Sequence, residues 1–235
     1  MRGWGKAVRC ITVLLVAAWG SIGLSVPASA TMVTSTLNVD FSDVISSGGT
    51  LTATFDDGDT SGSVTLTINA SALTPSSAFI GAFWFNYDGD ATTLSFANQT
   101  NASAIIQTCN NCTGGGNQQF RPGPDGFFDI LLDFPQPSGA TRFNAGEIYT
   151  VDITKAGIVA SDFNLLSISA PGGGGTWCTA AHVQGTGTGD GSDFLGGLCS
   201  VPLDQVVVPE PATLFLLGAG LIGVGVAARR KQLRR

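Results

Sequence analysis

The sequence predicts an all-β fold, a β-sandwich of the jelly-roll or immunoglobulin type, on three observations. Apolar and polar residues alternate in short runs, as at Leu51, Ala53 and Phe55, and a period of two is typical of half-buried strands. Clusters of Asp, Gly and Pro, such as 122–126, separate these runs in the way that turns do. No long stretch has a helical period. A closed barrel is the alternative that the pattern leaves open.

The expected strands follow from this alternation. The segment Phe79–Phe85 is apolar almost throughout, which predicts a central strand with both faces covered. The other expected strands are 37–41, 51–55, 64–68, 92–97, 127–134, 148–154, 163–169 and 180–184. The Gly-rich segment from Thr186 to Gly197 is expected to form a loop.

Charge is divided sharply along the chain of 235 residues. Residues 31–205 contain three of the 11 basic residues but 16 of the 17 acidic residues, so this segment has a net charge of −13. Nucleic acid is therefore excluded as an expected partner, because binding to phosphates requires Lys and Arg. The acidic excess suits a soluble exported domain and permits cation binding.

The N-terminus has the pattern of a secretory signal peptide, residues 1–30. Three basic residues precede an apolar run at 11–24, and Ala28 and Ala30 then form an A-x-A cleavage signal. We therefore expect export through the secretion translocon and cleavage after Ala30.

The C-terminus has the pattern of a single membrane-spanning helix. Residues 212–228 contain no charge, and their number is at the lower limit for crossing a bilayer core. The basic tail 229–235 follows, and by the positive-inside rule Arg229, Arg230 and Lys231 keep this end in the cytoplasm. The domain 31–206 is therefore expected to face outward, anchored through the helix.

A stiff tripeptide, Pro209-Glu210-Pro211, precedes the apolar segment. Proline fixes φ and removes backbone donors, so the tripeptide is extended and suits an enzyme groove. The tripeptide, the Gly-rich apolar stretch and the basic tail together resemble a PEP-CTERM sorting signal. The resemblance implies that residues 207–235 are a sorting segment, handled and cut by an exosortase of a Gram-negative bacterium that makes extracellular polysaccharide. Pro209, Glu210 and Pro211 would be the recognition element.

Four cysteines remain after signal removal: Cys109, Cys112, Cys178 and Cys199. An even number in an exported chain predicts disulfides. Of the three connectivities, Cys109–Cys112 with Cys178–Cys199 is the most economical. A zinc site is the competing interpretation, because C-x-x-C is a common ligand pair.

The sequence favours a non-enzymatic protein. Its one histidine, His182, lies four residues after Cys178, but a nucleophilic cysteine must be a free thiolate. A secreted hydrolase is therefore the least favoured function. We expect a structural or adhesive protein of the cell surface or matrix, linked to extracellular polysaccharide or biofilm.

Acidic loops raise the alternative of a calcium-assisted, lectin-like module. The calcium candidates are Asp56, Asp57, Asp59, Asp88 and Asp90, because calcium takes closely spaced carboxylates in loops. Asp is also an ordinary turn residue, so these residues can equally serve as turn residues without binding calcium. No other cofactor is expected. A lectin would also need an exposed aromatic ring, for which Trp84, Tyr87 and Trp177 are candidates.

Overall fold

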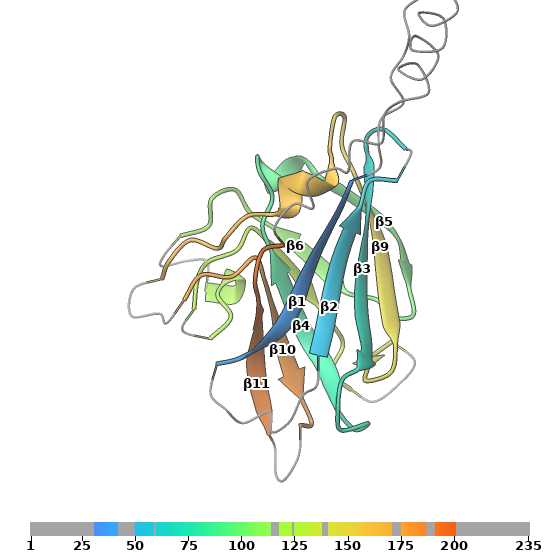
Figure 1. Ribbon diagram of the computed structural model, residues 1–235, viewed down its shortest axis with the longest axis vertical. Helices are drawn as coiled ribbons and strands as arrows, with labels where there is room; N and C mark the ends of the chain where they lie inside the picture. Colours follow the sequence, from blue (N-terminus) through green and yellow to red (C-terminus); the bar gives the residue numbers. More distant parts are fainter. Residues whose placement is uncertain are drawn as a thin grey trace, which may run out of the picture.

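One antiparallel sheet of eleven strands makes up the domain in the computed structural model (Figure 1). The structure describes residues 31–41, 50–58, 60–113, 118–123, 125–137, 141–170, 175–186 and 191–200. The expected signal peptide and the expected C-terminal helix at 212–228 lie outside these residues. Within the described ranges, no helix is long and apolar enough to cross a membrane.

The strands are β1 (Met32–Asp40), β2 (Thr50–Asp56), β3 (Ser63–Ala72), β4 (Phe79–Phe85), β5 (Ser95–Thr100), β6 (Ile105–Thr108), β7 (Ile130–Asp133), β8 (Phe143–Asn144), β9 (Ile148–Thr154), β10 (Thr179–Gln184) and β11 (Ser192–Gly197). Three short 3₁₀ helices, η1 (Ala91–Thr93), η2 (Gln118–Phe120) and η3 (Ala160–Phe163), lie in the connections.

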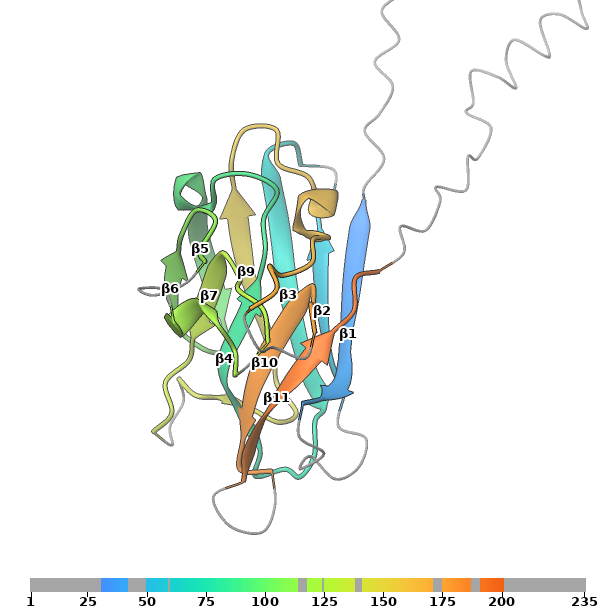
Figure 2. The ribbon, with the colours of Figure 1, turned by 90° about the vertical axis from the view of Figure 1, so that its left-hand side faces the viewer.

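The sheet is continuous and curls around a single main core. Its order is β5-β9-β3-β2-β1-β11-β10-β4-β7-β6, with β8 paired to β4. The two outermost strands of this order, β5 and β6, are consecutive in the chain. In the connection between them, the side chain of Gln99 accepts the N–H of Ala104 at 2.7 Å and donates to its carbonyl at 3.2 Å. Figure 2 shows the resulting curl.

The all-β class is confirmed, whereas the division into two stacked sheets is not. Since hydrogen bonding runs unbroken from β5 to β6, the nearly closed sheet lies closer to the barrel alternative than to a sandwich.

The core follows from the alternation seen in the sequence. In β2, Leu51, Ala53 and Phe55 are buried while their neighbours are partly exposed. The ring of Phe55 stacks on that of Phe163 with a centroid distance of 4.6 Å, and Tyr149 meets Phe134 edge to face at 5.0 Å. Such aromatic pairs stabilise beyond the area they bury.

Strand β4 confirms the expectation of a central strand. It pairs with β10 on one side and with β7 and β8 on the other, and six of its seven residues are buried. Phe83 and Phe85 belong to the main core, whereas Trp84 belongs to a second cluster on the opposite face. The apolar run is therefore explained by burial on both faces.

Several expected boundaries were wrong. Segment 163–169 is not a strand: η3 ends within it, and its only ladder contact is an isolated bridge between Ile168 and Phe127. The segment 92–97 begins as η1, because the Asp90 side chain accepts the N–H of Thr92 and caps a 3₁₀ turn. Strands β6 and β8 were not expected.

The largest error concerns β11, which lies within the segment expected to be a loop. It pairs with β1 and β10 and so joins the two halves of the sheet. Its glycines allow close packing: a Cβ on Gly197 would lie 2.3 Å from Ser35 Oγ and 2.4 Å from Thr179 Oγ1. Glycine at this position reflects close packing and not flexibility.

Candidate functional site

The outer face of the sheet carries two unlike surfaces. Across β1, β2, β3, β9 and β5, cross-strand pairing aligns one row of five threonines: Thr34, Thr54, Thr67, Thr150 and Thr100. Hydroxyls bond within this row at both of its ends, Thr34 to Thr54 at 3.1 Å and Thr100 to Thr150 at 2.6 Å. This half is a hydroxyl-lined surface.

The outer face of β11, β10, β4 and β7 instead carries a second hydrophobic cluster beneath the loops. A cross-strand row there contains Phe194, His182, Ala82, Asp133 and Ile105. Seven of the residues selected from the sequence, namely both tryptophan candidates, His182 and the four cysteines, lie on or beside the strands of this face. It is therefore the candidate functional site.

Trp84 is a structural residue of this face. Only 6% of its surface is exposed, and its Nε1–H donates to the carbonyl of Gln119 at 2.8 Å. Buried indoles usually find such a partner. The bond fixes the loop around η2 over the sheet, and Phe120 and Phe128 pack beside the indole in the same cluster.

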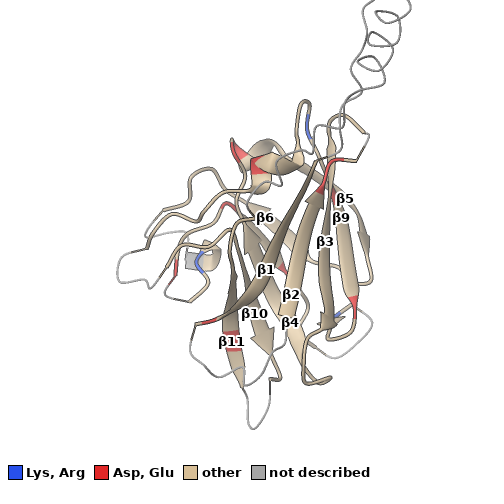
Figure 3. Ribbon diagram, in the orientation of Figure 1, with Lys and Arg blue, Asp and Glu red and all other residues tan. Residues whose placement is uncertain are grey.

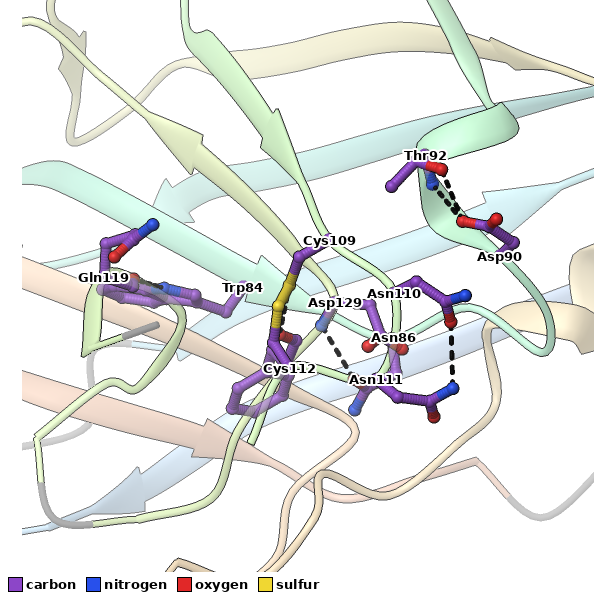
Figure 4. The surroundings of a disulfide bond; sticks show 11 residues. Trp84, Asn86, Asp90, Thr92, Cys109, Asn110, Asn111, Cys112, Gln119 and Asp129 are labelled. Atoms are coloured by element: carbon purple, nitrogen blue, oxygen red, sulfur yellow. Dashed lines mark hydrogen bonds between the residues drawn. A yellow bond between two sulfur atoms is a disulfide. The ribbon is translucent and has the colours of Figure 1, made fainter. Parts of the chain in front are cut away.

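The Cys109–Cys112 disulfide closes a small loop beside Trp84 (Figure 4). Asp129 holds this loop: its carbonyl accepts the N–H of Cys109 at 2.8 Å, and its carboxylate accepts backbone N–H groups of Tyr87, Cys112 and Asn111. Burial raises the pKa of Asp129, and these hydrogen bonds oppose the increase. Beneath it, Asn86 Oδ1 accepts the N–H of Asp129 at 3.1 Å.

The second disulfide, Cys178–Cys199, ties the segment after β11 to the start of β10. The structure thus contains the pairing that was most economical from the sequence. Since the four sulfurs are joined in two disulfide bonds, they are not available as the thiolate ligands of a zinc site. Cys178 likewise offers no free thiolate to His182.

His182 lies flat against an aromatic ring and not against a nucleophile. Its imidazole stacks on Phe194 with a centroid distance of 4.6 Å and an interplanar angle of 20°. Burial lowers the pKa of His182 and so favours the uncharged ring.

Of the three aromatic candidates, Trp84 and Tyr87 are buried, whereas Trp177 is partly exposed. It stacks on Phe41 at 5.3 Å, and Phe41 in turn stacks on Phe194 at 6.3 Å. We call Trp177, Phe41, Phe194 and His182 the aromatic strip; all four side chains are partly exposed. Sequence reasoning missed Phe194 because β11 was expected to be a loop, and it missed the role of Phe41 because the ring that Phe41 packs on lies in β11.

The acidic candidates lie away from this strip. Asp56 and Asp57, at the end of β2, line a hollow of about 360 Å³ together with Asp152 of β9. The carboxylate of Asp57 accepts the backbone N–H groups of Thr31 and Ala160, and Asp56 accepts that of Gly58 at 2.9 Å. Asp59 lies outside the described residues. Figure 3 shows acidic residues mainly at strand ends and in connections.

Asp88 and Asp90 serve the turn before β5. Hydrogen bonds from the Thr92 side chain and backbone lower the pKa of Asp90. The N–H of Asp88 donates to the carbonyl of Asp162 at 2.8 Å. Among the residues that the structure describes, no three His, Cys, Asp or Glu side chains gather closely enough to hold a metal ion. Calcium binding stays a prediction.

Comparison with known proteins identifies a motif in the C-terminal segment of the chain. Residues 207–231 match the family model of the PEP-CTERM protein-sorting motif. The chain therefore carries this motif, and Pro209, Glu210, Pro211, Arg229, Arg230 and Lys231 all lie within the match. The match supports an exported protein that is sorted by an exosortase and passes through the membrane to the cell surface.

The motif lies outside the described residues, and the comparison assigns nothing to the β domain. No curated protein and no solved structure matches the chain. What the domain does must therefore be argued from its own surface.

Proposed function

We propose that this protein is a structural or adhesive component of the cell surface or extracellular matrix, delivered there by exosortase processing of its tail. The sorting-motif match at residues 207–231 is the observation that carries the proposal. Within it, Pro209, Glu210 and Pro211 would enter the exosortase groove, and the basic residues 229–231 would keep the tail oriented in the membrane.

The disulfides of the β domain support an extracellular role. Two of them cross-link the domain, and each stabilises it by removing conformational freedom from the unfolded chain. Its acidic excess favours solubility and disfavours adhesion to anionic polymers. The proposed role is non-catalytic and is directed toward extracellular polysaccharide, as the sorting class implies.

Intact mass measured on the protein from its native cells tests the sorting proposal. We expect a chain that begins at Thr31 and ends near Pro209, with any added mass marking an attached group. Replacing Pro209, Glu210 and Pro211 by alanine should preserve the mass through Arg235, because the groove loses its stiff extended ligand.

The chain supplies a matched control for this experiment. Another Pro-x-Pro tripeptide, Pro135-Gln136-Pro137, lies in the β domain, and its replacement by alanine should leave tail processing unchanged. A wild-type mass that already includes Arg235 would overturn exosortase processing and leave a simple anchored domain.

A further inference from the structure

We propose that the Cys109–Cys112 disulfide is a site of reversible thiol–disulfide exchange, at which Cys109 bonds covalently to a thiol from outside the domain. This inference goes beyond the proposed function and does not depend on it. The two cysteines follow β6 and lie beside Trp84 on the candidate face (Figure 4). The reactant is defined by its chemistry, a free thiol, which can belong to a small molecule or to another protein.

The two cysteines differ in their exposure. Cys109 is partly exposed, and Asn110 and Asn111 after it are exposed. Cys112, by contrast, is only 3% exposed and packs in the cluster that contains Trp84. Exchange requires a thiolate to reach one sulfur of the pair, and access decides which sulfur is attacked. An incoming thiol is therefore directed to Cys109, and Cys112 becomes the leaving group.

The loop between the cysteines is held in place without its disulfide. The N–H of Cys109 donates to the carbonyl of Asp129 at 2.8 Å. The carboxylate of Asp129 accepts the N–H groups of Asn111 and Cys112. These bonds anchor both ends of the C-x-x-C segment through its backbone, and none of them involves sulfur. Opening the disulfide should therefore leave the segment in position, with its two sulfurs close enough to bond again.

The second disulfide is coupled more strongly to the fold. Cys178 and Cys199 are 21 positions apart, and the loop that they close contains β10 and β11. Cys109 and Cys112 are only three positions apart. A disulfide restricts the unfolded chain more when the closed loop is longer, so folding favours Cys178–Cys199 more than it favours Cys109–Cys112. The shorter pair should therefore be reduced first.

The exchange uses thiols as its reactants. A thiolate attacks Cys109 Sγ and forms a new S–S bond, while the electron pair of the Cys109–Cys112 bond leaves on Cys112 Sγ, which takes a proton from water. A second thiolate then attacks the sulfur of the attached reactant, and Cys109 leaves with the electron pair and is protonated. Two thiols are thus oxidised to one disulfide, and the cysteine pair gains two electrons. The carbonyl of Phe128, 3.7 Å from Cys109 Sγ, is an acceptor for the new S–H.

The first test uses the full chain in detergent, equilibrated in buffers of reduced and oxidised glutathione. Free thiols are alkylated, and the modified cysteines are located by peptide mass mapping. We expect the equilibrium constant for reduction to be about tenfold larger for Cys109–Cys112 than for Cys178–Cys199, the ratio that the two loop lengths give. Circular dichroism should not change while only the shorter pair is reduced. Reduction of both pairs together, or of Cys178–Cys199 first, would overturn the proposal.

The second test traps the covalent product. Cys112→Ser leaves Cys109 without its partner, and incubation with oxidised glutathione should add one glutathionyl group to Cys109. Cys109→Ser is the matched control, because it leaves the buried Cys112 of the same loop, which should add none. Equal addition to both variants, or no addition to Cys112→Ser, would contradict exchange at Cys109. Urea unfolding checks that both variants fold, and the wild-type titration decides the proposal where a variant does not.

The source of the thiol is distinguished by repeating the trapping with the disulfide dimer of a single-cysteine peptide. Addition of both glutathione and the peptide to Cys112→Ser would support a site that accepts protein thiols. Addition of glutathione alone would support a site restricted to small thiols.

Discussion

At the scale of single residues, the polar groups of the candidate face mainly position its loops. Asp129 shows this most clearly, because its carbonyl, its N–H and its carboxylate together join the Cys109–Cys112 loop to residues 86–87. The carboxylate is the backbone acceptor that keeps the Cys109–Cys112 loop against Trp84. Burial of that carboxylate carries a free-energy cost, which appears as its raised pKa.

This cost makes the stability of the domain depend on pH. The native state of Asp129 binds its proton more tightly than the unfolded state, whose pKa is near the ordinary value of 3.8. The free energy of unfolding should therefore rise as the pH falls from neutral through the raised pKa, and it should be lower at neutral pH. Asp129→Asn removes this titration.

Urea unfolding of the wild type and of Asp129→Asn, at pH values from neutral down to 3.8, measures the effect. The wild type should gain stability relative to the variant as the pH falls. Other carboxylates titrate in both proteins, so they cancel in the difference. A difference that is constant across this range would contradict a raised pKa at Asp129.

At the scale of secondary structure, β11 shows how packing overrides local composition. Gly196 and Gly197 have low intrinsic preference for strands, and yet β11 is bonded on both sides, to β1 and β10. Ser35 and Thr179 fill the space beside Gly197, and their hydroxyls lie 2.8 Å apart. Pairing on both sides holds β11 as a strand, and the neighbouring side chains leave room only for glycine at residue 197.

Gly197→Ala should therefore lower the free energy of unfolding by about 1–3 kcal/mol, the usual cost of overpacking. Thermal or urea unfolding checks this value. Ser35→Ala removes the nearest of the atoms that the new Cβ would meet, so the double variant should lose less stability than the two single changes together. Strictly additive effects would show that the contact with Ser35 is not the cause.

The strands that sequence reasoning predicted well are those whose signal is local. In β2, β3 and β9, one face lies in the core and the other faces solvent. Apolar and polar residues therefore alternate along each strand with a period of two. In β4, Phe83 and Trp84 are buried on opposite faces, so the signal is a continuous apolar run.

The elements that were missed depend on partners far along the chain. Phe194 packs on Phe41 and His182, so the aromatic strip exists only once β1, β11 and β10 are adjacent. Nothing within residues 192–197 indicates that adjacency. The sorting motif, by contrast, is a linear signal, and the sequence was sufficient to predict it.

At the scale of the whole molecule, the two ends of the domain leave it at the same place. Strand β1 starts at the end where β11 finishes, because the two are antiparallel. Ser35 Oγ donates to the carbonyl of Leu198 at 2.9 Å, and Figure 2 shows the start of β1 and the segment after β11 at the same end of the sheet. The described parts of the chain thus begin and end at the same end of the sheet.

The tail is firmly attached on the domain side. Cys199 is linked to Cys178, and Asn164 Nδ2 donates to the carbonyl of Ser200 at 3.0 Å. Only residues 201–208 then separate the folded domain from Pro209. Even fully extended, eight residues span at most roughly 30 Å. If exosortase recognises the tripeptide, as we propose, it would do so with the folded domain close by.

Linker length should therefore limit processing. Deleting residues 201–206 leaves a reach of only about 7 Å, which would press the folded domain against the enzyme and slow cleavage several-fold. Inserting six Gly/Ser residues after Ser200 should leave cleavage at the wild-type rate, and scrambling 201–206 controls for composition. Pulse-chase labelling followed by intact mass measures the conversion of each variant. Wild-type processing of the deletion variant would show that exosortase does not need this clearance, and impaired processing of the scrambled variant would assign the effect to sequence instead of distance.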